Sequence, residues 1–409
     1  MTGLADPGPA PHIRQSSILL YALAYLGAFL TFVPFFSILL PLKVVAVAPS
    51  DEVRLMSAIA TWGALAASAA NILFGAMSDR TWARSRTRRP WITAGFIGTL
   101  AAYIAIHSST EPQDLILAVI ALQVAINMLL GPLVAVMADE VPDRQKGRVA
   151  ALLAIAHPLA SLSGALLVIP AASEGQRYFV LCMLISAALL PFSALFREKG
   201  AGARVEASTV PLRRSANYFL VWLARLLVQT AGVTVSTYVF LFLMSAGRSF
   251  GPAPFNMTND QFIASLIASA TLVAVGVTLG AGRLSDFSGR RRPFIALAAL
   301  TMTIALPTLA TAGSWSMAAF AYGLFVSGYS IFIALHSAFA METLPAPRHR
   351  ARDLGILNLT NTIPALIVPL VILTRGQALA PIFAFLGLVT AGGGLIMMFA
   401  RRDLSPPGA

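Results

Sequence analysis

Two arginine-rich stretches share a pattern: residues 78–92 read SDRTWARSRTRRPWI and residues 285–295 read SDFSGRRRPFI. The prolines within the two stretches lie 203 positions apart. A second pair of segments, DEVP at 139–142 and ETLP at 342–345, has the same spacing. Two separate landmarks with one offset indicate an internal duplication, in which each copy is about half of the 409-residue chain.

The segments around these stretches are strongly apolar. Hydrophobic residues make up 57% of the chain and charged residues only 11%, whereas soluble proteins carry about 25% charged residues. A soluble chain of this length could not cover its surface with so few charges, so the composition excludes a soluble enzyme. The apolar runs are continuous and do not alternate with polar residues, which predicts membrane-spanning helices and excludes a membrane β-barrel.

Twelve apolar runs are long enough to cross a bilayer, which takes about 20 residues. The first six are 17–42, 55–77, 91–107, 115–137, 149–171 and 178–196. The second six are 216–245, 261–282, 293–312, 316–341, 354–374 and 380–400. They predict an all-α membrane protein of two pseudo-symmetric six-helix bundles. Its expected parts are a tail at 1–15, a bundle at 16–196, a linker at 197–215, a bundle at 216–402 and a tail at 403–409.

The basic residues are unevenly divided between the two sides of these spans. With both termini on one side, that side holds 23 of the 29 Lys and Arg residues and the other side holds 5, while Arg225 lies within a span. The positive-inside rule therefore places both termini in the cytoplasm, in a multi-pass protein of the plasma (inner) membrane. The same rule explains the formal charge of +12, so we expect a lipid bilayer and no nucleic acid as partner.

The cysteine count limits the chemistry further. The single cysteine, Cys182, excludes a disulfide framework and a Cys-based metal cluster. We expect no metal site and no bound cofactor, and we expect a monomer. The chain has no HExxH, no Gly-x-Ser-x-Gly and no phosphate-binding loop, so a membrane-embedded enzyme is disfavoured.

A similar group of residues precedes each arginine-rich loop. The group is Gly75, Asp79 and Arg80 at the end of the second span, and Gly282, Asp286 and Arg290 around the end of the eighth. A glycine lets two helices approach closely, and an aspartate at the membrane surface can accept from helix N-termini or pair with arginines. We interpret each group as a latch that joins helices in one conformation and releases them in another. The alternative is that the arginines only fix the topology.

These Gly-x-x-Ser-Asp groups with their arginine-rich loops resemble the loop signature of the major facilitator superfamily. The Ser-Asp and Arg-Arg-Arg-Pro forms resemble, more specifically, the glycoside–pentoside–hexuronide cation symporters and the sucrose-type carriers. The run from Asn127 to Gly131-Pro132 in the fourth span is similar to the sucrose-type pattern. The resemblance implies secondary transport of a small polar solute, a sugar or a sugar acid, by alternating access.

The chain departs from this pattern at two places. The sucrose-type pattern has an arginine two residues after Gly-Pro, where this chain has Val134. The melibiose-type members carry aspartates inside the second and fourth helices for cation coupling, and this chain has none there. A sodium site is therefore not expected, and any coupling ion would be a proton.

Arg225 is the most unusual polar residue of the spans. It lies nine residues past Ala216, roughly 14 Å along a helix axis. Gln229 and Ser236 share its helix face. Two interpretations stay open: Arg225 pairs with Asp139, Glu140, Asp353 or backbone carbonyls, or its missing anion is the substrate.

Other polar residues fall on helices that line the central cavity in this superfamily. With Arg225 and Gln229, the predicted substrate-binding residues are Tyr21, Tyr25, Gln123, Asn127, Tyr329 and His336. Amide and phenol groups can satisfy sugar hydroxyls, and aromatic rings can cover apolar sugar faces. Each of these residues alone could instead form an interhelical hydrogen bond.

Three further features of the spans suggest moving parts. His157, directly before Pro158, is a candidate for proton coupling, with a packing role as the alternative. Asn358 and Asn361 are expected to form a gate or a helix contact. Pro34, Pro158 and Pro364 each remove a backbone hydrogen bond and permit a kink.

Two other functions remain open from the sequence. An apolar cavity with few polar residues would favour an exporter of amphiphilic, drug-like compounds. A uniporter without ion coupling would need no titratable group in the cavity.

Overall fold

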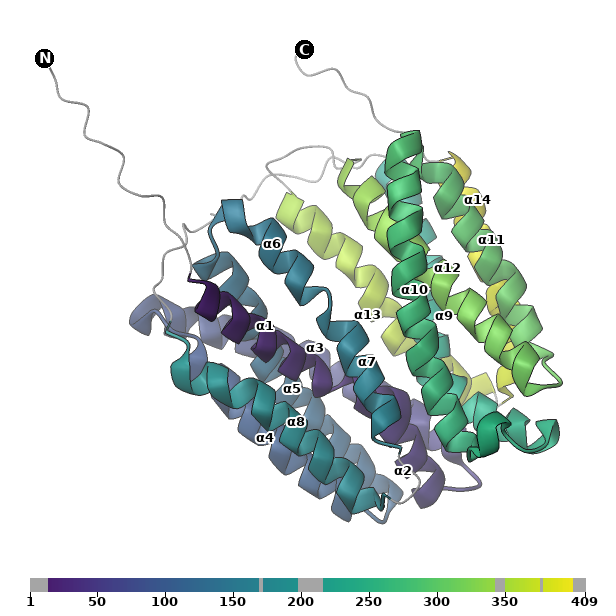
Figure 1. Ribbon diagram of the computed structural model, residues 1–409, viewed down its shortest axis with the longest axis horizontal. Helices are drawn as coiled ribbons and strands as arrows, with labels where there is room; N and C mark the ends of the chain where they lie inside the picture. Colours follow the sequence, from purple (N-terminus) through teal and green to yellow (C-terminus); the bar gives the residue numbers. More distant parts are fainter. Residues whose placement is uncertain (1–13, 169–171, 198–215, 343–349, 376–377, 400–409) are drawn as a thin grey trace, which may run out of the picture.

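The computed structural model describes residues 14–168, 172–197, 216–342, 350–375 and 378–399, and its regular elements there are all helical (Figure 1). The first bundle contains α1 (Gln15–Leu30), the π-helix η1 (Phe35–Leu39), α2 (Leu40–Val47), α3 (Glu52–Ser85), α4 (Arg89–Ser108), α5 (Pro112–Glu140), α6 (Asp143–Leu153), α7 (Ala156–Leu166) and α8 (Glu174–Leu195). The second contains α9 (Ala216–Phe250), the short 3₁₀ helix η2 (Pro254–Asn256), α10 (Asn259–Ser288), α11 (Arg291–Ala310), α12 (Trp315–Glu342), α13 (Arg350–Arg375) and α14 (Leu379–Phe399). Nearly all of the predicted linker and tails lies outside the described residues.

The two bundles repeat one packing scheme. In the first, α1 packs against α8 and α7, and α5 packs against α3 and α4. In the second, α9 packs against α14 and α13, and α12 packs against α10 and α11. The predicted all-α fold is thus confirmed, and the repeated packing is consistent with two six-helix bundles.

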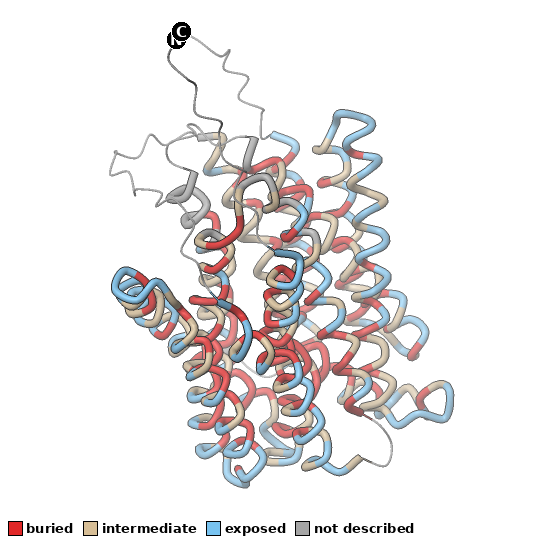
Figure 2. Tube along the Cα trace, turned by 60° about the vertical axis from the view of Figure 1, so that its left-hand side comes forward, coloured by how far each residue is buried: buried red, intermediate tan, exposed pale blue. Residues whose placement is uncertain are grey.

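Ten helical stretches of the described chain are long and apolar enough to cross a membrane. The fifth span position is filled by α6 and α7 together, and the eleventh by α13, whose described apolar part is Leu359–Thr374. Buried residues follow the inner faces of the helices and exposed ones the outside (Figure 2). Large apolar side chains such as Ile72, Phe179 and Leu388 are exposed there, which suits contact with lipid.

Two prolines break their helices at a definite place. Proline lacks an N–H and its ring clashes with the carbonyl of residue i−4. Pro34 lies four residues after Leu30, the last residue of α1, and Pro158 lies four residues after Ala154, where α6 ends. The fifth span, predicted at about 149–171 with an interruption at Pro158, therefore consists of two helices, and the first of them begins earlier than predicted, at Asp143.

The second and eighth spans are longer than predicted. Their apolar runs end at about residues 77 and 282, and we expected the helices to end near Arg80 and Asp286. In the structure α3 continues to Ser85 and α10 to Ser288, because a helix need not end where the membrane does. Each instead ends at a residue in the left-handed conformation, Arg86 with φ 54° and Gly289 with φ 63°.

The bundles contact each other unequally along their length. We call the end with the loops after α3 and α10 the arginine-rich end, and the other the opposite end. At the opposite end Ser57 bonds Tyr238 at 2.7 Å and Arg177 lies 3.9 Å from Asp260. Towards the arginine-rich end the helices diverge: α7 packs against α10, whereas α6 packs against α1 (Figure 1).

Candidate functional site

A central cavity lies between the bundles. It consists of two adjoining parts with volumes of about 410 and 370 Å³. Both parts are lined by His157 of α7, Ser236 of α9, Thr271 of α10 and Tyr322 of α12. Each bundle therefore contributes wall residues, and a molecule in the cavity would contact both.

The cavity wall is mostly apolar. No carboxylate, lysine or arginine occurs among the described residues that line its two parts. Its polar members are Ser37, Gln123, His157, Ser161, Ser236, Thr237, Thr271, Thr278, Tyr322, Tyr329 and Ser330. A wall of this kind suits a solute with substantial apolar surface and a few polar groups.

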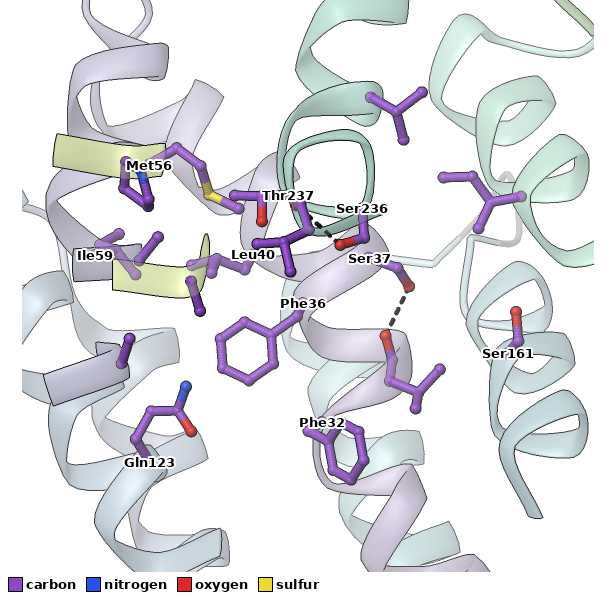
Figure 3. Close-up of a pocket in the computed structure, with 18 of the residues that line it drawn as sticks. Phe32, Phe36, Ser37, Leu40, Met56, Ile59, Gln123, Ser161, Ser236 and Thr237 are labelled. Carbon is purple, nitrogen blue, oxygen red and sulfur yellow. Dashed lines mark hydrogen bonds between the residues drawn. The ribbon is translucent and has the colours of Figure 1, made fainter. Parts of the chain in front are cut away.

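Several wall hydroxyls are already used as donors. Ser37 donates to the Val33 carbonyl at 2.7 Å (Figure 3), and Thr271 donates to the Ile267 carbonyl at 2.8 Å. Ser236 donates likewise within its own helix. The oxygens of Ser37 and Ser236 can therefore accept from a solute, whereas Thr271 Oγ1 already accepts from Ser161 at 3.4 Å. The Gln123 amide has no side-chain partner in the described structure, so it can both donate and accept.

The π-helix η1 shapes one wall. It follows Pro34 directly and carries Phe36 and Ser37, both of which line the cavity with Phe32 (Figure 3). π-helical turns are rare and occur often at functional sites. The phenyl rings give this wall a broad apolar surface.

His157 faces both parts of the cavity. Its ring lies edge-on to Phe29, with ring centroids 5.9 Å apart, and no described residue forms a hydrogen bond with it. Both imidazole nitrogens are therefore available to a solute or to water.

The other predicted binding residues fall into two groups. Gln123 and Tyr329 line the cavity. Tyr21 is buried and donates to the Leu133 carbonyl, and Tyr25 packs beside it. Asn127 bonds to the Gln123 carbonyl and to Asn71. These last three do not line the two parts.

Arg225, Gln229 and His336 form a polar cluster with Tyr329 between α9 and α12. Arg225 Nη1 donates to Ser337 Oγ at 2.8 Å, and the Tyr329 hydroxyl donates to Gln229 Oε1 at 2.9 Å. His336 is fully buried, and its Nε2 lies 2.9 Å from the Val221 carbonyl. Since a carbonyl only accepts, Nε2 carries the proton.

The first predicted latch is organised by a residue that we had not singled out. Arg88 is buried and donates to Asp79 at 2.7 Å and to Asp139 at 2.6 Å, so it joins α3 to α5. Burial lowers its pKa, but the bonds to the two carboxylates outweigh this and raise the pKa above its usual value. Arg88 therefore keeps its charge at physiological pH. The sequence did contain a sign of this contact: several arginines precede Pro90, and two aspartates, Asp79 and Asp139, lie at the ends of the second and fourth spans on the same side.

The remaining latch residues form fewer contacts. Asp286 pairs with Arg291 at 3.3 Å and is largely exposed. Arg80 and Arg290 are exposed. A Cβ atom at Gly75 or Gly282 would meet no atom within 4 Å, so neither glycine is at a close helix contact in this structure.

The predicted gate is described only in part. The side chain of Asn358 lies outside the described residues, and Asn361 is partly buried in α13. Sequence analysis missed Phe32, Phe36 and Tyr322 because an apolar residue in a span gives no sign of which way it faces.

Two bundles of membrane-spanning helices around a shared cavity are the architecture of a multi-pass membrane transporter. The sequence matches the model of the Major Facilitator Superfamily over residues 17–369. The chain belongs to this superfamily, and it is a transporter rather than an enzyme. No curated protein matches it in sequence.

Solved structures of three transporters share the fold. A bacterial homologue of the human lysosomal transporter Spinster, inward-facing and unoccupied, has a TM-score of 0.66 at 15% identity over 96% of both chains. The peptide transporter POT in complex with sulfate has a TM-score of 0.70 at 11% identity over 94% of both chains. A point mutant of the nucleoside transporter NupG has a TM-score of 0.69 at 13% identity, covering 93% of this chain and 98% of that one.

Proposed function

We propose that this transporter moves a small amphiphilic solute across the plasma membrane by alternating access. The observation that carries the proposal is the cavity wall, where aromatic and aliphatic side chains surround a few hydroxyl and amide groups. Such a wall binds an apolar body and orients it through a few hydrogen bonds. The arginine-rich end would face the cytoplasm, in line with the positive-inside rule.

A sugar or sugar acid is the second candidate. The resemblance of the loops to glycoside–pentoside–hexuronide symporters and sucrose-type carriers supports it, as does the free amide of Gln123. A sugar needs many hydrogen-bond partners, however, and Ser37, Ser236 and Thr271 have already donated their protons. For this reason we place the amphiphilic solute before the sugar as the candidate substrate.

Proton coupling is a further part of the proposal. Among the described residues that line the cavity, His157 is the one histidine, and imidazole exchanges protons near neutral pH. Replacement by glutamine keeps the polarity and removes the titration. In a coupled carrier, His157→Gln abolishes uptake driven by a pH gradient and preserves exchange of solute across the membrane. Equal loss of both would assign His157 to binding alone.

The test uses two matched serines of α9. Ser236 lines the cavity, and Ser249 is exposed near the far end of the same helix. Tryptophan at position 236 fills the cavity, so Ser236→Trp should abolish saturable binding of the neutral probe 1-decanol in nanodiscs, measured above its partitioning into protein-free nanodiscs, while Ser249→Trp should not. Counterflow of sucrose or glucuronate in proteoliposomes, with no saturable binding of decanol, would favour the second candidate.

A further inference from the structure

Arg225 lies on the cavity side of α9. Gly232 is 7 and Ser236 is 11 positions after Arg225, and residues at these spacings share one face of a helix. Both Gly232 and Ser236 line the cavity. Arg225 is therefore on a continuation of the same wall. It is about 10 Å nearer the arginine-rich end than Gly232.

The charge of Arg225 is not neutralised by any described residue. One guanidinium nitrogen donates to Ser337 Oγ at 2.8 Å, and that hydroxyl donates onward to the Ile333 carbonyl. Nε is buried and has no hydrogen-bond partner. Asp139, a partner suggested by the sequence, is engaged by Arg88 instead. Arg225 is partly buried, and the side chain of Asp353 lies outside the described residues. A charge without a described partner within a span is costly, which favours a functional use for it.

A second donor group lies one turn away. The Gln229 Oε1 accepts from the Tyr329 hydroxyl at 2.9 Å, which leaves the amide N–H groups of Gln229 free. The Tyr329 phenol also lines the cavity. Arg225 and Gln229 thus hold unpaired donors beside Tyr329, close to the cavity wall that Tyr329 and Gly232 line.

We infer that Arg225 and Gln229 bind an anionic head group, a carboxylate or a phosphate, of the transported solute. The guanidinium offers two parallel N–H donors to such a group, and the tail would lie in the apolar cavity. The absence of carboxylates from the described wall means that nothing there repels an anion. The inference rests on the proposed function and adds the charge of the solute to it.

The test compares two arginines of α9. Arg248 is exposed in the last turn of the helix, far from the cavity, and serves as the matched control. Binding of decanoate, 1-decanol and decylamine is measured by calorimetry on the full chain in nanodiscs of uncharged lipid. We expect decanoate to bind best of the three probes to the wild type. Arg225→Gln should weaken decanoate binding about 10- to 100-fold and leave decanol binding unchanged. Arg248→Gln should change neither.

A second variant guards against misfolding of Arg225→Gln. Gln229→Leu keeps the charge and removes the neighbouring donors, so it should weaken decanoate by a smaller factor and leave decanol unchanged. Decanoate binding that is insensitive to both variants overturns the inference.

Two other outcomes separate this inference from the proposed function. Equal binding of decanoate and decanol, both blocked by Ser236→Trp, overturns the anion subsite and leaves the amphiphile proposal standing. Failure of all three probes overturns both. Binding of chloride or inorganic phosphate that Arg225→Gln abolishes, without any effect of this variant on decanoate, would assign Arg225 to a free anion and overturn the head-group inference.

Discussion

Arg88 shows what a single charge does in this fold. It is buried, and its guanidinium holds Asp79 and Asp139 on two helices. Arg88→Ala leaves both carboxylates unpaired. Because Asp139 is mostly shielded from solvent but Asp79 is largely exposed, the variant should lose about 1–3 kcal/mol of stability and melt at a lower temperature in nanodiscs. Arg84→Ala is the control, since Arg84 is exposed in the same segment. Equal melting temperatures for the two variants would show that Arg88 joins nothing.

Gly232 makes a different prediction at the residue scale. A Cβ atom there would collide with the Tyr329 ring, so Gly232→Ala should push the phenol away from Gln229 and cost about 1–3 kcal/mol. Gly276→Ala on α10 is the control, since that position has open space around it. Calorimetry should find weaker solute binding in the first variant only; unchanged binding would place Tyr329 outside the site.

At the scale of elements, the break between α6 and α7 is open to test. Pro158→Ala restores an N–H and removes the clash with Ala154, so the two helices can join, with a gain of up to about 3 kcal/mol. If the break is a hinge, transport slows while the melting temperature holds or rises. Pro191→Ala is the control, because α8 continues unbroken through Pro191. A transport rate equal to wild type would mean that the break is static.

The sequence predicted those features of the helices that depend only on neighbouring residues in the chain. Spans follow from the length of apolar runs, which is a local property, so their positions were predicted well. Breaks do not follow from proline alone: Pro34 and Pro158 interrupt their helices, whereas Pro132 and Pro364 lie inside continuous ones. Neighbouring helices can satisfy the freed backbone groups, and this packing is not visible in the sequence.

At the scale of the whole molecule, the uneven contact between the bundles predicts a pattern of access. In a Cys182→Ala background, Gly282→Cys should react with a charged, water-soluble thiol reagent, since it has open space around it. Ser57→Cys should not, because Ser57 is fully buried against Tyr238. A saturating solute should change both rates in opposite directions. Equal labelling of both positions would contradict the open arginine-rich end.

The duplication at an offset of 203 residues predicted the two bundles correctly. It could not predict which side chains line the space between them, because that depends on how each helix is rotated about its own axis. Gln123 and Tyr329 were found because they are polar; Phe32, Phe36 and Tyr322 were not found, because their roles depend on packing between helices.

The guanidinium of Arg225, which no described residue neutralises, would also make the carrier sensitive to the membrane potential. A cavity open to one side shares the potential of that side, so Arg225 passes from one potential to the other when access switches. Moving one charge through the full field is worth about 2.3 kcal/mol per 100 mV, roughly a fiftyfold change in the ratio of the two states. Binding of an anion cancels that charge. The empty carrier would therefore respond to voltage, while the loaded carrier would be nearly indifferent to it.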